Sequence, residues 1–196
     1  MIPRSPNSDF ATGLRNLFAS DQRGQAILEF AITLPLLVVF VVGIYDFSGA
    51  FNEKQKIEQA AHVGAILAGA QPMSDIQVSN TNPSSLLPVV TAIVNSLSAS
   101  GVVAGACTPP GAVTGGANLT WKYTVSNCPG NLTITINRGW EGGVGSAGSP
   151  ASLGTVVTVV YPYTWRFNSV IQSLIPGAAY AATTQLTESA TVHNQM

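Results

Sequence analysis

Few side chains in this 196-residue chain could carry out acid–base, nucleophilic or metal chemistry. Charged residues make up 9% of it, whereas typical soluble domains carry roughly 25%. The two histidines, His62 and His193, are far apart in sequence, and the two cysteines are too few for a zinc cluster. We therefore expect that the protein binds no metal and no cofactor and that it is not an enzyme. An activity that was lost on replacing Glu141 or Glu188 would contradict this expectation.

One short motif could suggest a cofactor. Residues Gly143–Gly148 match the G-x-G-x-x-G pattern of dinucleotide-binding loops, which requires a following helix and an acidic residue about twenty positions later. Here Pro150 and a strand-like segment follow, and no Asp or Glu occurs between Glu141 and Glu188. The motif therefore predicts a glycine-rich hairpin loop.

The carboxylate in the most unusual position is Glu29, the single charge within the apolar stretch 26–45. A carboxylate in an apolar membrane helix costs up to a few kcal/mol, so sequences normally avoid it. Glu29 could be a structural residue that reaches the lipid headgroups. It is not isolated, however, because Gly24, preceded by the basic Arg23, stands five residues upstream.

A basic leader that ends in glycine, a glutamate at the fifth position after it and then an apolar helix resembles the cleavage signal of type IV pilins and pseudopilins. The residues in this pattern are Arg23-Gly24-Gln25-Ala26-Ile27-Leu28-Glu29-Phe30. With Leu34-Pro35-Leu36-Leu37 and Gly43-Ile44-Tyr45-Asp46-Phe47, the segment is similar to the TadE-like family, pseudopilins of the tight-adherence (Tad, or Flp) pilus system. A weaker similarity extends over 153–192.

The resemblance implies a processing site formed by Gly24, Gln25, Glu29 and Phe30. A prepilin peptidase would cleave between Gly24 and Gln25, and Glu29 would then pair with the free N-terminal amine of a subunit in the pilus. The implied partners are this peptidase, other Tad pilins and pseudopilins, the inner-membrane assembly platform and membrane lipid. The implied function is that of a minor pseudopilin in pilus assembly, adhesion and biofilm formation.

The apolar stretch 26–45 must position this site. Twenty residues of helix measure roughly 30 Å, the thickness of a bilayer core, so a single membrane-spanning helix is expected. Arg4, Arg15 and Arg23 precede the stretch, and the positive-inside rule therefore places the N-terminus in the cytoplasm and the rest outside the bacterial inner membrane. The protein could also be associated with the pilus.

An ordinary secretory signal is the competing interpretation. The residues Ser48-Gly49-Ala50 have the small side chains of a signal-peptidase site. Cleavage there would release a protein that begins at Phe51, an extracytoplasmic binding module. This interpretation leaves Gly24 and Glu29 unexplained.

The remaining pattern predicts an α+β head. The apolar spacing continues the first helix to about residue 70, half of it amphipathic, and predicts a short second helix over 84–98. Alternation over 119–125, 132–136, 156–161 and 181–192 predicts a four-stranded antiparallel sheet. The expected organisation is a leader (1–24), a transmembrane and amphipathic helix (25–70) and an extracytoplasmic head (71–196).

Cys107 and Cys128 are the only cysteines of the chain. An exported head favours a disulfide between them, since oxidising compartments preserve such bonds. Two free buried thiols are the alternative. The near-zero net charge of −1 excludes nucleic-acid binding through a broad basic surface, so no nucleic-acid partner is expected.

Overall fold

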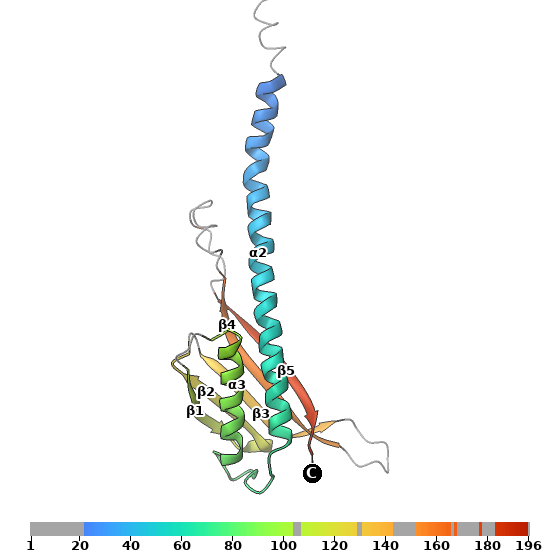
Figure 1. Ribbon diagram of the computed structural model, residues 1–196, viewed down its shortest axis with the longest axis vertical. Coiled ribbons are helices and arrows are strands. Elements are labelled where there is room, and N and C mark those ends of the chain that lie inside the picture. The colour runs from blue at the N-terminus through green and yellow to red at the C-terminus, as the bar shows by residue number, and fades with distance from the viewer. Residues whose placement is uncertain are drawn as a thin grey trace, which may run out of the picture. The chain divides into compact units, whose positions relative to one another are not determined.

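The computed structural model describes residues 22–103, 107–128, 131–142, 152–165, 167, 177 and 183–195. Figure 1 shows a long first helix followed by a shorter helix and a sheet. The helices are α2 (Gln22–Gly69) and α3 (Leu87–Ala99), with short 3-10 turns at Ser84–Leu86 and Ala117–Leu119. The strands are β1 (Thr108–Gly115), β2 (Thr120–Ser126), β3 (Leu132–Gly142), β4 (Ser152–Thr164) and β5 (Thr183–His193).

The chain divides into two compact units, Met1–Tyr45 and Asp46–Met196. The division falls inside α2, between the last residue of the apolar stretch and the first charged residue after it. Residues 46–69 of α2 are therefore part of the second unit, which we call the head. The predicted long helix, short helix and antiparallel sheet are all present.

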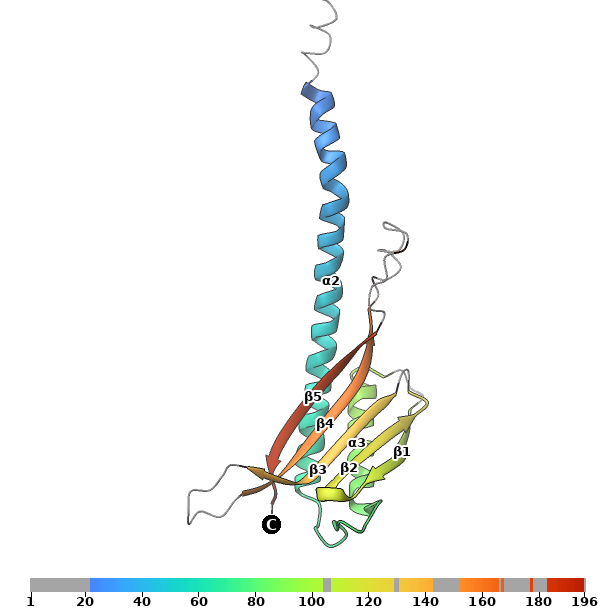
Figure 2. The ribbon, with the colours of Figure 1, turned by 180° about the vertical axis from the view of Figure 1, so that it is seen from behind.

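The sheet has five strands, and the predicted number of four is wrong. All neighbouring strands are antiparallel in the order β1-β2-β3-β4-β5, which Figure 2 shows from behind. The additional strand, β1, contains Pro109 and Pro110, which cannot donate backbone hydrogen bonds and hide the alternating pattern. Strand β1 is at the edge of the sheet, where prolines are tolerated, and its register with β2 shifts between Thr108 and Ala112.

One face of the sheet forms the core of the head with α3 and the last turns of α2 (Figure 1). In the central strands every second side chain is buried, as at Tyr123, Ile134 and Val159. Alternate positions on the other face carry threonines, and Thr135 pairs with Thr158 across β3 and β4. Uncharged hydroxyl groups thus cover the half-buried face of the sheet, which accounts for part of the low charge content.

The helices approach each other closely at Gly64 of α2. A Cβ atom at this position would lie 2.5 Å from Cδ1 of Ile93, a fully buried residue of α3. Any larger residue there would force the Ile93 side chain to shift within the packed core, so glycine is favoured at this position. An ion pair between Lys54 Nζ and Glu188 Oε1, 3.2 Å apart, links α2 to β5.

Cys107 and Cys128 form a disulfide that ties the start of β1 to the end of β2. It closes a loop with a sequence separation of 21, which corresponds to about 3 kcal/mol of stabilisation in the chain-entropy model. We expect the double variant Cys107→Ser, Cys128→Ser to lose about this free energy of unfolding, measured by urea titration of the full chain in detergent.

Thr114→Ala provides a control for this variant, since Thr114 is an exposed residue of β1 and its replacement should change stability by less than about 0.5 kcal/mol. A mass increase of about two on reduction would verify the bond in the purified protein. A double variant as stable as Thr114→Ala would contradict the prediction.

Candidate processing site and membrane anchor

The predicted processing residues lie on the first turns of α2. The helix begins at Gln22, so the bond between Gly24 and Gln25 lies within its first turn. Gly24, Gln25, Glu29 and Phe30 are all exposed. The first turn contains no acidic residue to stabilise it, and glycine disfavours a helix by about 1 kcal/mol relative to alanine. The first described turn, which contains the predicted cleavage bond, therefore has few of the features that stabilise a helix start.

Glu29 is hydrogen-bonded within its own helix. Gln25 Nε2 donates to Glu29 Oε1 over 3.2 Å, one turn away. The Thr33 hydroxyl donates to the Glu29 carbonyl oxygen over 2.7 Å. One amide donor leaves most of the acceptor capacity of a carboxylate available to an incoming cation. The Glu29 carboxylate can therefore accept further hydrogen bonds.

The apolar side chains between Ile27 and Tyr45 surround the helix on every side. Ile27, Phe30 and Ile32 are 70%, 64% and 71% exposed, and none of the most apolar 18-residue window is buried. The helix is long and apolar enough to cross a membrane, although a signal sequence shares these properties. In this it differs from the core helix of a soluble protein, which is mostly buried. Pro35 lies within it, as membrane helices tolerate.

The head begins with a contact that the sequence did not predict. The Tyr163 hydroxyl donates to Asp46 Oδ1 over 3.2 Å, and both residues are almost fully buried. Gly49 permits this approach, since a Cβ atom there would lie 3.1 Å from the Tyr163 oxygen. Asp46 is the first charged residue after sixteen uncharged ones, and its partner lies 117 positions away in the sequence.

Another polar contact lies just before the start of α3. The carboxylate Oδ2 of Asp75 accepts hydrogen bonds from the Ser85 backbone N–H over 2.8 Å and from the Ser84 hydroxyl over 3.2 Å. Asp75 thus caps the 3-10 turn that leads into α3, in a role that local sequence would assign to Ser84 or Ser85. Burial alone raises the pKa of Asp75, but these hydrogen bonds outweigh it, and the net pKa is below its ordinary value.

Tyr123 of β2 is fully buried in the core. No described residue forms a hydrogen bond with its hydroxyl group. Burial, and then the negative charge of Asp75, raise the pKa of Tyr123 from 10.0 to about 12. The folded head therefore keeps this tyrosine neutral at pH values where the unfolded chain ionises it.

We expect the head to lose stability as the pH rises from 10 to about 12, because only the unfolded state then gains the favourable ionisation of Tyr123. The rise of the Tyr123 pKa from 10.0 to about 12 corresponds to roughly 2–3 kcal/mol of stability, present in full below pH 10. Urea titrations of the full chain across this range should show a smaller decline in Tyr123→Phe. Equal declines in the two proteins would contradict the assignment to Tyr123.

A buried arginine joins distant parts of the head. Arg138 of β3 is 1% exposed, and its Nη2 donates to the Gln71 carbonyl oxygen, just past α2, over 2.9 Å. Its Nη1 donates to Thr155 Oγ1 over 3.4 Å, and that hydroxyl donates in turn to Asn194 Oδ1 over 2.5 Å. Burial lowers the pKa of Arg138, while the charge of Asp75 opposes this shift. The network is structural in character.

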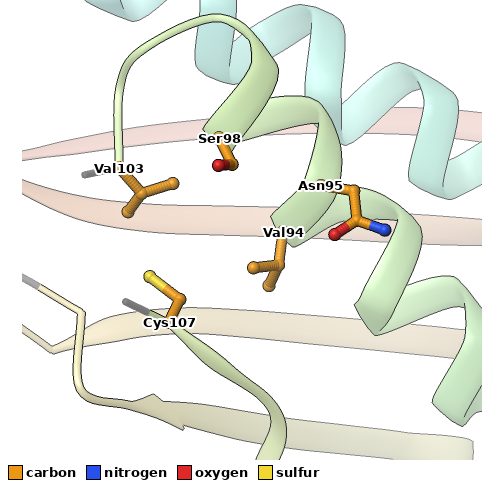
Figure 3. Close-up of a pocket in the computed structure, with 5 residues that line it drawn as sticks. All are labelled: Val94, Asn95, Ser98, Val103 and Cys107. Atoms are coloured by element: carbon orange, nitrogen blue, oxygen red, sulfur yellow. The ribbon is translucent and has the colours of Figure 1, made fainter. Parts of the chain in front are cut away.

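A cavity of about 110 Å³ lies beside the disulfide (Figure 3). Its lining residues come from α3 and the segments around Val103 and Cys107, and they are Val94, Asn95, Ser98, Val103 and Cys107. None of these side chains can act as an acid or a base, because Cys107 is held in the disulfide. The described part of the chain also contains no group of three His, Cys, Asp or Glu residues that could hold a metal.

Some sequence predictions fall outside the described residues. They include most of the leader, 1–21, and the loop predicted at Gly143–Gly148. His62 and His193 are described, and both are exposed.

The described residues define a class of protein with one N-terminal helix suited to crossing a membrane and a disulfide-bonded α+β head. Residues 24–65 match the model of a family described as TadE-like protein. The match confirms the resemblance inferred from the sequence and includes all four predicted processing residues. No curated protein and no solved structure matches the chain significantly.

Proposed function

We propose that this protein is a minor pseudopilin of the tight-adherence pilus, which a prepilin peptidase cleaves between Gly24 and Gln25. The observation that carries this proposal is the TadE-like match over residues 24–65, on a helix whose apolar surface is uncovered. Its role is structural: the protein acts in pilus assembly, and through it in adhesion and biofilm formation. No catalytic step is assigned to it.

The chemistry of Glu29 supports this proposal. A carboxylate surrounded by hydrocarbon is unfavourable, and a neighbouring ammonium group offsets this cost. Cleavage before Gln25 creates such a group, the new N-terminal amine. In an assembly of parallel helices, the amine of one subunit would lie beside Glu29 of the next. The hydrogen bond from Gln25 Nε2 keeps the Glu29 side chain directed toward its own N-terminus.

The proposed arrangement places residues 1–24 in the cytoplasm as a leader, 25–70 across and beyond the inner membrane, and 71–196 outside. The partners are the prepilin peptidase, other Tad pilins or pseudopilins, the inner-membrane platform and membrane lipid. The positive charges at Arg4, Arg15 and Arg23 support this orientation.

The contacts of the head argue against cleavage at an ordinary signal site after Ala50. Such cleavage would remove Asp46, the hydrogen-bond partner of Tyr163, and Gly49, against which Tyr163 lies. It would also remove Ala50, which is 7% exposed and belongs to the buried apolar residues. These residues contribute to the folded head, so we favour the processing site at Gly24.

The test is the N-terminus of the mature protein. In membranes of cells that contain the prepilin peptidase, we expect Edman sequencing and intact mass to give a chain that begins at Gln25. Gly24→Leu should remain full-length, because the new side chain blocks the peptidase subsite. Gly43→Leu is the matched control and should be processed normally, since a Cβ atom at Gly43 meets no other atom within 4 Å.

An intact Arg23–Gly24 bond in the presence of the peptidase would contradict the proposal. A mature chain that begins at Phe51 would instead indicate a secreted or membrane-tethered binding module with an ordinary signal sequence.

A further inference from the structure

Three aromatic rings form a cluster where the head begins, and we call Phe47, Tyr163 and Trp165 the aromatic cluster. The ring centroids of Phe47 and Trp165 are 5.4 Å apart, and those of Tyr163 and Trp165 are 5.2 Å apart, both in edge-to-face geometry. Phe47 is on α2, Tyr163 is near the end of β4, and Trp165 directly follows that strand. The cluster therefore joins the first turn of the head to one end of its sheet.

The polar atoms of the aromatic cluster are directed to protein partners. The Tyr163 hydroxyl donates to Asp46, and the Trp165 indole N–H donates to Thr184 Oγ1 over 2.7 Å. Phe47 is nevertheless 64% exposed. Asp46, which is 4% exposed, is the only charged residue between Tyr45 and Glu53. Within the described residues, the cluster thus presents apolar ring surface with satisfied donors and no exposed charge, properties suited to the boundary between hydrocarbon and headgroups.

The apolar stretch ends only two residues before Phe47 in the sequence. Phe47 follows Tyr45 by two residues, or about 3 Å along the axis of a helix. The headgroup layer on each side of a bilayer core is roughly 5–7 Å thick. If residues 26–45 span the core, Phe47 and the rings in contact with it lie within that layer, where Trp and Tyr side chains are enriched.

We propose that the aromatic cluster binds the outer surface of the same bilayer that α2 crosses and holds the membrane-proximal end of the sheet against the lipid headgroups. This inference depends on the proposed membrane insertion of α2. The aromatic cluster contacts the bilayer interface through Trp165 and Phe47, which lie among the lipid headgroups. The β4 end of the sheet is thereby fixed at the membrane.

The opposite end of β4 provides an internal control. Trp140 of β3 pairs with Gly154, nine residues before Tyr163 on β4, or roughly 30 Å along a strand. Trp140 is 37% exposed, and Trp121 is fully buried. The chain has three tryptophans. Trp165 is at the proposed interface, Trp140 is far from it, and Trp121 is inside the core.

The experiment measures tryptophan quenching by lipid in the full chain, reconstituted into vesicles of phosphatidylcholine and phosphatidylglycerol. The lipids carry bromine either near the carbonyl or near the methyl end of the acyl chain. Trp140→Phe retains Trp165, and Trp165→Phe retains Trp140. We expect at least about twofold stronger quenching in Trp140→Phe than in Trp165→Phe, and stronger quenching by the shallow bromine than by the deep one.

The outcomes separate the two proposals. Flotation with the vesicles after an alkaline wash reports insertion of α2, independently of the quenching. A protein that floats but shows equal, weak quenching in both variants would overturn the contact of the aromatic cluster with lipid and leave the pseudopilin proposal intact. A protein that does not float would overturn both. Trp140→Phe alters an exposed residue and leaves the aromatic cluster intact, so the comparison of shallow with deep bromine within this variant does not depend on the stability of Trp165→Phe.

Discussion

Glu29→Ala is expected to abolish pilus assembly while leaving membrane insertion and the fold of the head unchanged. If this protein is a pseudopilin as proposed, the variant removes the carboxylate and leaves the N-terminal ammonium group of a neighbouring subunit without its partner in hydrocarbon. Breaking a buried ion pair in this way costs about 3–5 kcal/mol, and each 1.4 kcal/mol changes an association constant tenfold. We therefore expect about a hundredfold or greater loss of surface pili, counted by electron microscopy or by shearing and immunoblotting.

Two controls distinguish the role of Glu29 in assembly from other effects. Glu58→Ala removes an exposed carboxylate from the same helix, within the segment that matches the family, and should assemble normally. The N-terminus of Glu29→Ala should still be Gln25, which would show that cleavage precedes the defect. Normal piliation in Glu29→Ala would contradict the pseudopilin proposal and favour a tethered binding module.

Arg138→Ala is expected to destabilise the head by about 3–5 kcal/mol. The side chain fills buried volume, and its loss leaves a cavity as well as a Gln71 carbonyl oxygen without its Arg138 donor. Gln71 lies two residues past the end of α2, Thr155 is on β4, and Asn194 directly follows β5. A single substitution thus weakens contacts between segments that are far apart in the sequence.

Arg138→Met separates the contribution of volume from that of charge. It retains most of the volume and removes the buried charge, so we expect a smaller loss of about 1–2 kcal/mol. Lys122→Ala, an exposed change on β2, is the control and should fall within about 0.5 kcal/mol of the wild type. Urea titration of the full chain in detergent measures all three, and an Arg138→Ala protein within 1 kcal/mol of the wild type would contradict the assignment.

Much of the fold follows local patterns in the sequence. The long apolar helix, the short amphipathic helix and four of the five strands were predicted, because side-chain periodicity reports directly on helices and strands. The ends of the strands were harder to predict from the sequence. Strand β4 continues through Pro162, which pairs with Gln185 of β5 beyond the last residue pair between β3 and β4. Proline is tolerated there because no donor toward β3 is required.

For the candidate site, too, some residues were proposed from the sequence and others were found only in the structure. Gly24 and Glu29 were proposed as processing residues from their spacing within eight residues, since such a motif is a pattern of neighbouring residues. The partners of Asp46, Asp75 and Arg138 were not, because these contacts depend on strand register and on how the helices lie against the sheet.

The sequence by itself predicted the apolar helix, the proposed processing motif and the resemblance to the TadE-like family, because each depends on residues that are near neighbours along the chain. Only the tertiary structure decided the fifth strand, the buried Arg138 network and the aromatic cluster at the start of the head. Phe47 and Trp165 are separated by more than a hundred positions, and only the packing of α2 against the end of β4 brings their rings into contact. Such contacts leave no periodic signal, since they arise from the meeting of two elements whose local patterns are independent.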